Sequence, residues 1–326
     1  MARFPVPNSA SLHGARAFIE KLDAFAPSDE ALLEFHPKWA HLEPLALAMI
    51  ASWGAWCRRK GLHIRGHNLG KHARYAARMK LFEHLGIEYE QQIAEHEEAG
   101  RFLPVTQVNA KRNVGAVIGA ISALLHLQDD PESLAAVQYC VSELLRNVLE
   151  HAASPDGAFV CAHRYSSGRT PRVSIAVADC GQGIASHLGQ VVADASTSDE
   201  TALRLAMRPG VTGAKAGLYG TPDNAGAGLF ITRCIARGTG GYFLVLSGNA
   251  GYRMRRALRD EDQLALYTDA FSDPRSDRWR FPQAWKGTVV AVEIRTEQIA
   301  HYEGFFQWIF EQIPGRSSAK RRIHFT

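Results

Sequence analysis

The sequence predicts an α/β (α+β) protein with a small α/β domain over residues 1–105 and a larger domain over 106–300. The larger domain is expected to be a two-layer sandwich of helices on a mixed sheet, followed by a C-terminal helix and basic tail over 301–326. Two observations lead to this fold class. Stretches with strand periodicity alternate with helical ones, and 326 residues suffice for two hydrophobic cores.

The N-terminal part reads as strand, helix, strand, helix. Strands are predicted over 31–36 (ALLEFH) and 62–67 (LHIRGH), and helices over 42–59 and 72–85. The first thirty residues show no clear pattern. The acidic segment 88–100 is either a linker or an exposed helix.

The second part begins with two helices. The first is predicted over 113–127, and the second starts with Asp130 as N-cap and Pro131 at the first helical position and runs to about Ala153. Further strands are predicted over 158–165, 172–179, 242–247 and 288–294, and further helices over 201–207, 229–237 and 298–313. Segment 208–227 is rich in glycine, and segment 260–286 is expected to be irregular.

The helix containing ELLRNVLEHA separates an apolar stripe from a polar side when its residues are placed at 100° steps. The stripe consists of Val137, Val141, Leu144, Leu145, Val148 and Ala152. Glu143 and Asn147 fall away from it, one turn apart. A carboxamide oxygen suits Mg²⁺, and a carboxylate can activate a water. The same pattern also fits an amphipathic helix whose polar side faces water, and the helix alone leaves both interpretations open.

The stretch VADCGQGI places Asp179 at the end of a strand, in phase with its apolar residues. A carboxylate on that side needs a hydrogen-bond donor, which the amino group of a purine would provide. Gly181 and Gly183 allow a sharp turn close to a ligand. A β-turn with a capping aspartate remains an alternative. A calcium loop is disfavoured, since the residues around these glycines supply no set of oxygen ligands.

A third motif, NAGAGLFITRCIAR, opens a helix with Gly226 and Gly228. Free N–H groups at such a helix start favour phosphate. The motif is neither a Walker loop nor a dinucleotide fingerprint, because it lacks the Lys-Ser/Thr pair of the first and the third glycine of the second. A flexible loop before a helix is the alternative.

In this order the motifs resemble those of the GHKL ATPase superfamily, the ATP-binding fold of gyrase B, a major heat-shock chaperone, MutL and sensor histidine kinases. The resemblance covers roughly residues 108 to 296. Glu143 and Asn147 match the N box, Asp179, Gly181 and Gly183 the G1 box, Gly226 and Gly228 the G2 box, and Gly287-Thr288 the terminal G-T.

The resemblance implies roles for these residues. Asn147 would bind Mg²⁺, Asp179 the adenine amino group, and Glu143 would be the general base. Thr288 would support Asp179 through a water, and residues 208–225 would form a lid. The implied ATP-binding set is Asn147, Asp179, Gly181, Gly183, Ile184, Gly226, Gly228, Leu229 and Thr288. In the lid, Lys215 and Arg208 are candidates for contact with the γ-phosphate.

The chain also departs from several branches of this superfamily. His96-Glu97-Glu98 lacks the Thr or Asn and the Pro of a phospho-accepting histidine motif, and no large transducer domain follows the motifs. The closest types are anti-sigma-factor-like serine kinases and stand-alone ATP-binding regulators, and the N-terminal part resembles a STAS-like domain. We therefore expect a Mg²⁺-dependent ATP-binding regulator that hydrolyses ATP or transfers its γ-phosphate to a protein serine or threonine. The alternatives are a non-catalytic ATP-gated switch and a module that binds a protein without nucleotide.

Composition sets limits on partners. The net charge of +4 gives no clear nucleic-acid signal. Five cysteines without a C-x-x-C pair indicate free thiols in a reducing compartment. The N-terminus has no apolar signal core, and the longest apolar run is too short to cross a bilayer. We expect a cytoplasmic protein, not bound to a membrane, with ATP and a protein as partners; a homodimer is left open.

Overall fold

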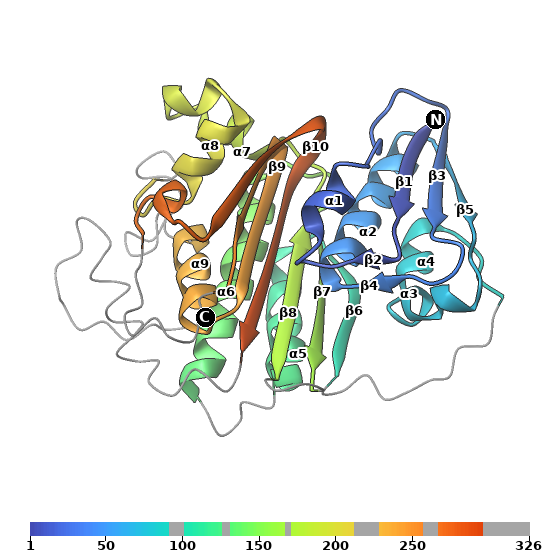
Figure 1. Ribbon diagram of the computed structural model, residues 1–326, viewed down its shortest axis with the longest axis horizontal. Coiled ribbons are helices and arrows are strands. Elements are labelled where there is room, and N and C mark those ends of the chain that lie inside the picture. Colours follow the sequence, from blue (N-terminus) through green and yellow to red (C-terminus); the bar gives the residue numbers. More distant parts are fainter. Residues whose placement is uncertain (91–100, 126–130, 167–170, 212–227, 257–266, 296–326) are drawn as a thin grey trace.

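The computed structural model describes residues 1–90, 101–125, 131–166, 171–211, 228–256 and 267–295. Helices and strands are mixed along the chain, as the sequence predicts, and two main sheets lie next to each other (Figure 1). Several predicted features lie outside the described residues: most of segment 88–100, the N-cap Asp130, most of the lid, and the helix over 298–313.

The N-terminal unit, residues 1–90, is built on a three-stranded parallel sheet in the order β1-β3-β5. Its strands are β1 (Ala2–Val6), β3 (Glu30–Phe35) and β5 (His63–His67), and the short pair is β2 (Ser9–Ala10) and β4 (His41–Leu42). Strands β3 and β5 are the two that the sequence predicts. Strand β1 is not predicted, because Pro5 interrupts its short apolar run; at the edge of a sheet a proline is tolerated.

The helices of this unit are α1 (Ala15–Ile19), α2 (Pro44–Arg59), α3 (Arg74–Arg78) and α4 (Leu81–Leu85), with a 3₁₀ turn η1 (Lys71–Ala73). The prediction of one helix over 72–85 is wrong. Lys80 adopts a left-handed conformation (φ 58°), which a continuous right-handed helix excludes. The break lets Leu81 and Leu85 turn into the core.

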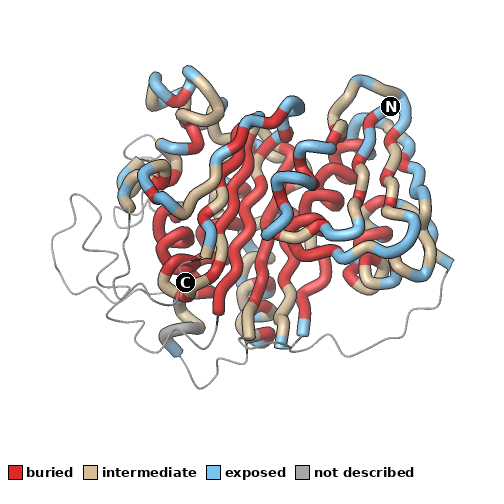
Figure 2. The backbone as a smooth tube through the Cα atoms, viewed as in Figure 1, coloured by how far each residue is buried: buried red, intermediate tan, exposed pale blue. Residues whose placement is uncertain are grey.

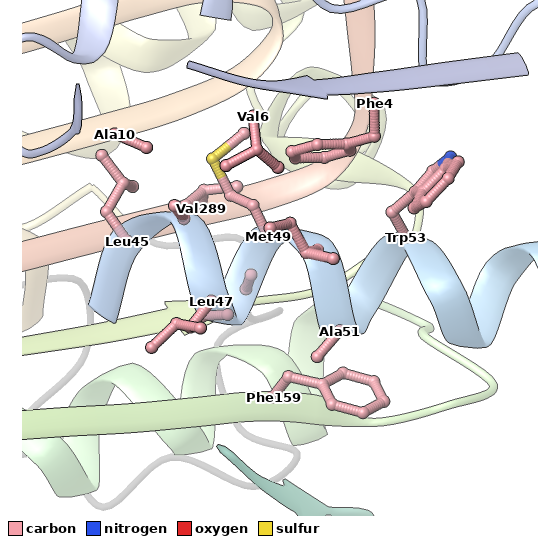
Figure 3. Packing of buried hydrophobic residues seen from close by; sticks show 14 of the residues in the cluster. Phe4, Val6, Ala10, Leu45, Leu47, Met49, Ala51, Trp53, Phe159 and Val289 are labelled. Atoms are coloured by element: carbon pink, nitrogen blue, oxygen red, sulfur yellow. The ribbon is translucent and has the colours of Figure 1, made fainter. Parts of the chain in front are cut away.

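Helix α2 is buried on all sides from Pro44 to Cys57. Figure 3 shows why: its upper side lies against Phe4 and Val6 of β1, and its lower side lies over Phe159 of the second sheet. Each fully buried large apolar side chain contributes roughly 1.5–3 kcal/mol. Helix α2 therefore serves as the common core of the N-terminal unit and the second sheet.

The second sheet has five strands in the order β6-β7-β8-β10-β9, and all neighbours are antiparallel. Its strands are β6 (Phe102–Val108), β7 (Ala158–Tyr165), β8 (Arg172–Ala178), β9 (Tyr242–Met254) and β10 (Ser276–Arg295). The prediction of a mixed sheet is thus wrong for this part of the chain. The boundary predicted at residue 105 falls inside β6, so the change of sheet lies before Phe102.

Helices cover both faces of this sheet. On one face lie α5 (Val114–Leu125), entered through η2 (Lys111–Asn113), α6 (Pro131–His151) and α9 (Gly228–Gly238). Alternate residues of β8 point to that helix layer, while Ala176 and Ala178 point to the cluster around α2. The second sheet and the helices α5, α6 and α9 thus form the predicted two layers, and α2 packs on the other face of the sheet, between it and the N-terminal sheet. The middle of the second sheet is buried on both faces (Figure 2), whereas the first part of β10 alternates between buried and exposed residues.

The remaining elements are α7 (Gly183–Leu188), η3 (Ala193–Ser196) and α8 (Asp199–Ala206), which form a small group at one end of the sheet, and η4 (Ala270–Ser272) (Figure 1). The prediction that 260–286 is irregular is wrong for its last part, where β10 already runs. In this part, buried aromatic residues at odd positions alternate with more exposed residues, which is the periodicity of a strand; the aromatic residues are Trp279, Phe281 and Trp285.

Candidate functional site

Asp179 follows β8 directly and is completely buried, as its phase in the strand predicts. Its two carboxylate oxygens accept hydrogen bonds from backbone N–H groups: Oδ1 from Gly181 at 2.7 Å and Oδ2 from Thr288 at 3.2 Å. Burial raises the pKa of Asp179 to about 7, although both N–H donors act to lower it. A buried carboxylate with unused lone pairs can accept a further proton donor from a ligand.

The turn after Asp179 is packed against the end of α6. A Cβ atom on Gly181 would lie 2.1 Å from the Ala152 carbonyl oxygen, so only glycine fits there. The Gln182 N–H donates to the same carbonyl at 2.8 Å, and its side-chain amide donates to the His151 carbonyl at 2.7 Å. Gly183 has a φ of 77°, which favours glycine. The turn therefore fixes Asp179 relative to the C-terminal end of α6.

The G-T pair at 287–288 closes the site from the neighbouring strand β10. Gly287 has a φ of 87°, and a Cβ there would lie 2.4 Å from the carbonyl oxygen and Oδ1 of Asp179. Thr288 contacts Asp179 directly through its backbone, while its hydroxyl lies 3.3 Å from Ser247 Oγ. The Ser247 hydroxyl also accepts from the Ile184 N–H at 2.9 Å and donates to the Gly287 carbonyl at 3.0 Å. Sequence reasoning missed Ser247, for which no local signal exists.

The polar side of α6 differs from its expected arrangement. Glu143 does not face water: it is 3% exposed and lies under the start of α9, where a Cβ on Gly228 would come within 2.6 Å of its Oε2. Arg146 Nη2 lies 2.6 Å and 2.7 Å from the two carboxylate oxygens. Burial raises the pKa of Glu143, although the Arg146 guanidinium opposes the shift. Arg146 was also missed, although its i,i+3 spacing from Glu143 could have identified it.

The other predicted residues are less closely engaged. The Asn147 side chain is half-buried and makes no hydrogen bond within the described residues, and Leu229 and Ile184 are half-buried against the helix layer. Arg208 is not free, because its guanidinium lies 3.3 Å from Asp269. Gly226 and Lys215 lie outside the described residues.

Two histidines flank the Gln182 turn. His151 at the end of α6 and His187 on α7 stack with ring centroids 4.7 Å apart. Burial lowers the pKa of both side chains, so the neutral forms are favoured. The pair packs α7 against α6 beside the site.

Comparison with known proteins adds no assignment: no family model, curated protein or solved structure matches the chain. Within the described ranges, no three His, Cys, Asp or Glu side chains are grouped so that they could hold a metal ion. The helices that the structure describes include none with both the length and the apolar character needed to cross a membrane.

Proposed function

We propose that this protein is a Mg²⁺-dependent ATP-binding regulator of the histidine kinase-like ATPase type, which hydrolyses ATP or transfers its γ-phosphate to a protein serine or threonine. One observation carries the proposal. Gly181, beside the candidate base-recognition group Asp179, contacts Ala152, while Gly228, at the candidate phosphate site, contacts Glu143. Ala152 and Glu143 are nine residues apart in the sequence. At a helical rise of 1.5 Å per residue, the two contacts therefore lie about 13 Å apart along the axis of α6. This separation is on the scale of an extended nucleoside triphosphate.

The contacts between the predicted motifs also support the GHKL-type assignment for the second sheet and its helices. The motifs that resemblance predicts come from different parts of the chain and contact one another across α6, β8 and β10. For the N-terminal unit, the alternation of parallel strands with helices supports the resemblance to STAS-like domains.

In the proposed complex the base would be recognised by Asp179, whose carboxylate would accept the adenine amino group. The first N–H groups of α9, from Gly228 onward, are positioned at a helix start that favours phosphate. Asn147 fits a magnesium site, because Mg²⁺ bound to a nucleotide takes one or two protein oxygens and fills its remaining positions with phosphate and water. When bound, the ion would neutralise charge on the phosphates.

Glu143 is the candidate proton acceptor for an attacking water or protein hydroxyl. Burial raises the pKa of Glu143 above its ordinary value, and a carboxylate with a raised pKa is a stronger base. The ion pair with Arg146 opposes this role, since a carboxylate held by a guanidinium is a weaker base. That contact favours the second candidate function, an ATP-gated switch in which the nucleotide binds and orders a partner surface without turnover.

The base assignment is tested by calorimetry at pH 8, with and without Mg²⁺, comparing ATP with inosine triphosphate. Inosine triphosphate carries a carbonyl oxygen in place of the adenine amino group. We expect it to bind roughly 100-fold more weakly, because two acceptors would face each other in a buried site. The variant Asp179→Asn should lose ATP affinity, with its fold checked by circular dichroism. Equal affinity for both nucleotides, or an unchanged variant, would overturn the assignment.

The reaction is tested with Glu143→Gln, and Glu200→Gln on α8 is the control. Glu200 pairs with Arg280 at 2.9 Å and lies outside the predicted motifs. If Glu143 is the base, its variant should retain ATP binding and lose turnover by about 100-fold or more. Label from the γ-phosphate then separates hydrolysis, which releases inorganic phosphate, from transfer to protein. ATP binding without any turnover in the wild type would establish the switch.

A further inference from the structure

The main chain and carboxylate of Asp179 are held at four points. Its N–H donates to the Thr288 carbonyl at 2.9 Å, and its two carboxylate oxygens accept from Gly181 and Thr288. The fourth contact is the only one from a side chain: the indole Nε1 of Trp285 donates to the Asp179 carbonyl at 3.1 Å. Trp285 is itself 4% exposed. The indole therefore satisfies a buried carbonyl that water does not reach.

The chain is irregular where Trp285 lies. The pairing of β10 with β9 shifts register on both sides of this residue, between Arg280 and Trp285 and between Trp285 and Thr288. Such bulges redirect side chains, and they are found next to functional sites. Here the irregularity brings the indole N–H to Asp179 and the Gly287 backbone against the same residue.

The N-terminal unit contacts this arrangement from the opposite face of the sheet. Phe25 packs edge-on against Trp285, with ring centroids 5.1 Å apart, and against Trp56 of α2, at 5.0 Å. The Lys286 ammonium lies 5.9 Å and 5.8 Å from the centroids of the same Phe25 and Trp56 rings. A separate contact joins α2 to the residue after Asp179: the Ser52 hydroxyl donates to Cys180 Sγ at 3.1 Å.

We propose that Trp285 is a positioning residue for nucleotide recognition, through which the N-terminal unit holds the Asp179 turn in its base-binding shape. The inference rests on the proposed function in one respect, namely that Asp179 recognises the base. A change in the packing of Phe25 or α2 would reach Asp179 through a chain of direct contacts: one aromatic ring, one indole and one hydrogen bond.

The experiment uses the full chain with Trp285→Phe, which keeps an aromatic ring and removes the N–H donor. The matched control is Trp279→Phe, a buried tryptophan of the same strand that packs on Phe281 and Arg253. The first measurement is amide hydrogen exchange without nucleotide. Exchange at the Gly181 and Thr288 amides should be roughly tenfold faster in Trp285→Phe, because local opening becomes easier, and unchanged in the control.

The second measurement is the ratio of ATP to inosine triphosphate affinity. This ratio should fall about tenfold in Trp285→Phe, because one hydrogen bond to a buried group is lost. If Trp285 had a purely structural role, its replacement would lower the affinity for both nucleotides by the same factor and leave the ratio unchanged. The variant Phe25→Leu, which leaves the indole in place, should shift exchange and ratio in the same direction by a smaller factor.

Normal exchange at both amides in Trp285→Phe and Phe25→Leu overturns the proposal. If Trp285→Phe fails to fold, Phe25→Leu alone decides by the same exchange measurement. Absence of ATP binding in the wild type would instead refute the proposed function. The exchange measurement without nucleotide would still decide whether Trp285 and Phe25 position the Asp179 turn.

Discussion

The Asp179 carboxyl should contribute a loss of stability to the nucleotide-free protein as the pH rises. Its pKa is raised from 3.8 to about 7 because it is buried, with the backbone N–H groups of Gly181 and Thr288 offsetting only part of the effect. Between these two values the folded protein holds a proton that the unfolded chain has released. Stability from this group is therefore complete below about pH 4 and is lost as the pH rises through about 7.

The size of the effect follows from the two pKa values. They differ about 1000-fold in proton affinity, which corresponds to roughly 4 kcal/mol at 1.36 kcal/mol per tenfold. Over the accessible range from about pH 5 to about pH 8, the expected loss is about 3 kcal/mol, most of it below pH 7. Histidines with lowered pKa, such as His163, change stability in the opposite direction, so the Asp179 contribution has to be isolated.

The assay is urea denaturation of the wild type and of Asp179→Asn across this pH range. The asparagine amide does not titrate. Its NH₂ group would face one of the two backbone N–H donors, and this unfavourable contact lowers the stability of the variant by an amount that does not depend on pH. All other groups titrate alike in both proteins. The variant should therefore gain about 3 kcal/mol relative to the wild type between pH 5 and pH 8. A difference that stays constant with pH would refute the reasoning, since Asp179 would then keep an ordinary pKa.

Three further predictions follow from the same contacts. If adenine donates to Asp179, ATP binding near pH 7 should favour the ionised carboxylate and release more protons than binding of inosine triphosphate does. Calorimetry in buffers of different ionisation enthalpy measures this difference. Gly181→Ala should destabilise the fold by about 2 kcal/mol or more in urea denaturation, whereas Gly115→Ala, with open space around its Cβ, should be neutral or stabilising. Arg237→Met should lower the free energy of unfolding by about 3 kcal/mol by leaving Asp273 buried without its ion pair, and adding Asp273→Asn should restore much of it.

The sequence allowed the helix layer of the second sheet to be predicted. The apolar stripe of α6 is buried in full, and the helices α5 and α9 and the strands β7 and β8 begin and end within a few residues of the predicted positions. These elements are long and strongly periodic, so local pattern and tertiary packing favour the same structure.

The docking of α2 on the second sheet could not be predicted. An all-round apolar helix indicates burial, yet its sequence does not say which two surfaces cover it. Some signal was present in β7 and β8, whose residues are apolar at both odd and even positions, which indicates strands buried on both faces. Trp285 carried no such signal, because its role depends on a register shift that only the paired strands reveal.

Asp179 is the residue whose presence is hardest to explain by folding alone. Two backbone N–H groups would be satisfied by neutral acceptors, without the desolvation that raises its pKa. The fold nevertheless surrounds this carboxylate with glycines that allow close backbone approach at 181 and 287, and with an indole on its carbonyl. Ionisable groups whose pKa is strongly shifted by burial are concentrated at ligand-binding and catalytic sites. A donor that arrives with a ligand would stabilise the ionised form, so the burial that destabilises the empty protein would strengthen recognition of the base.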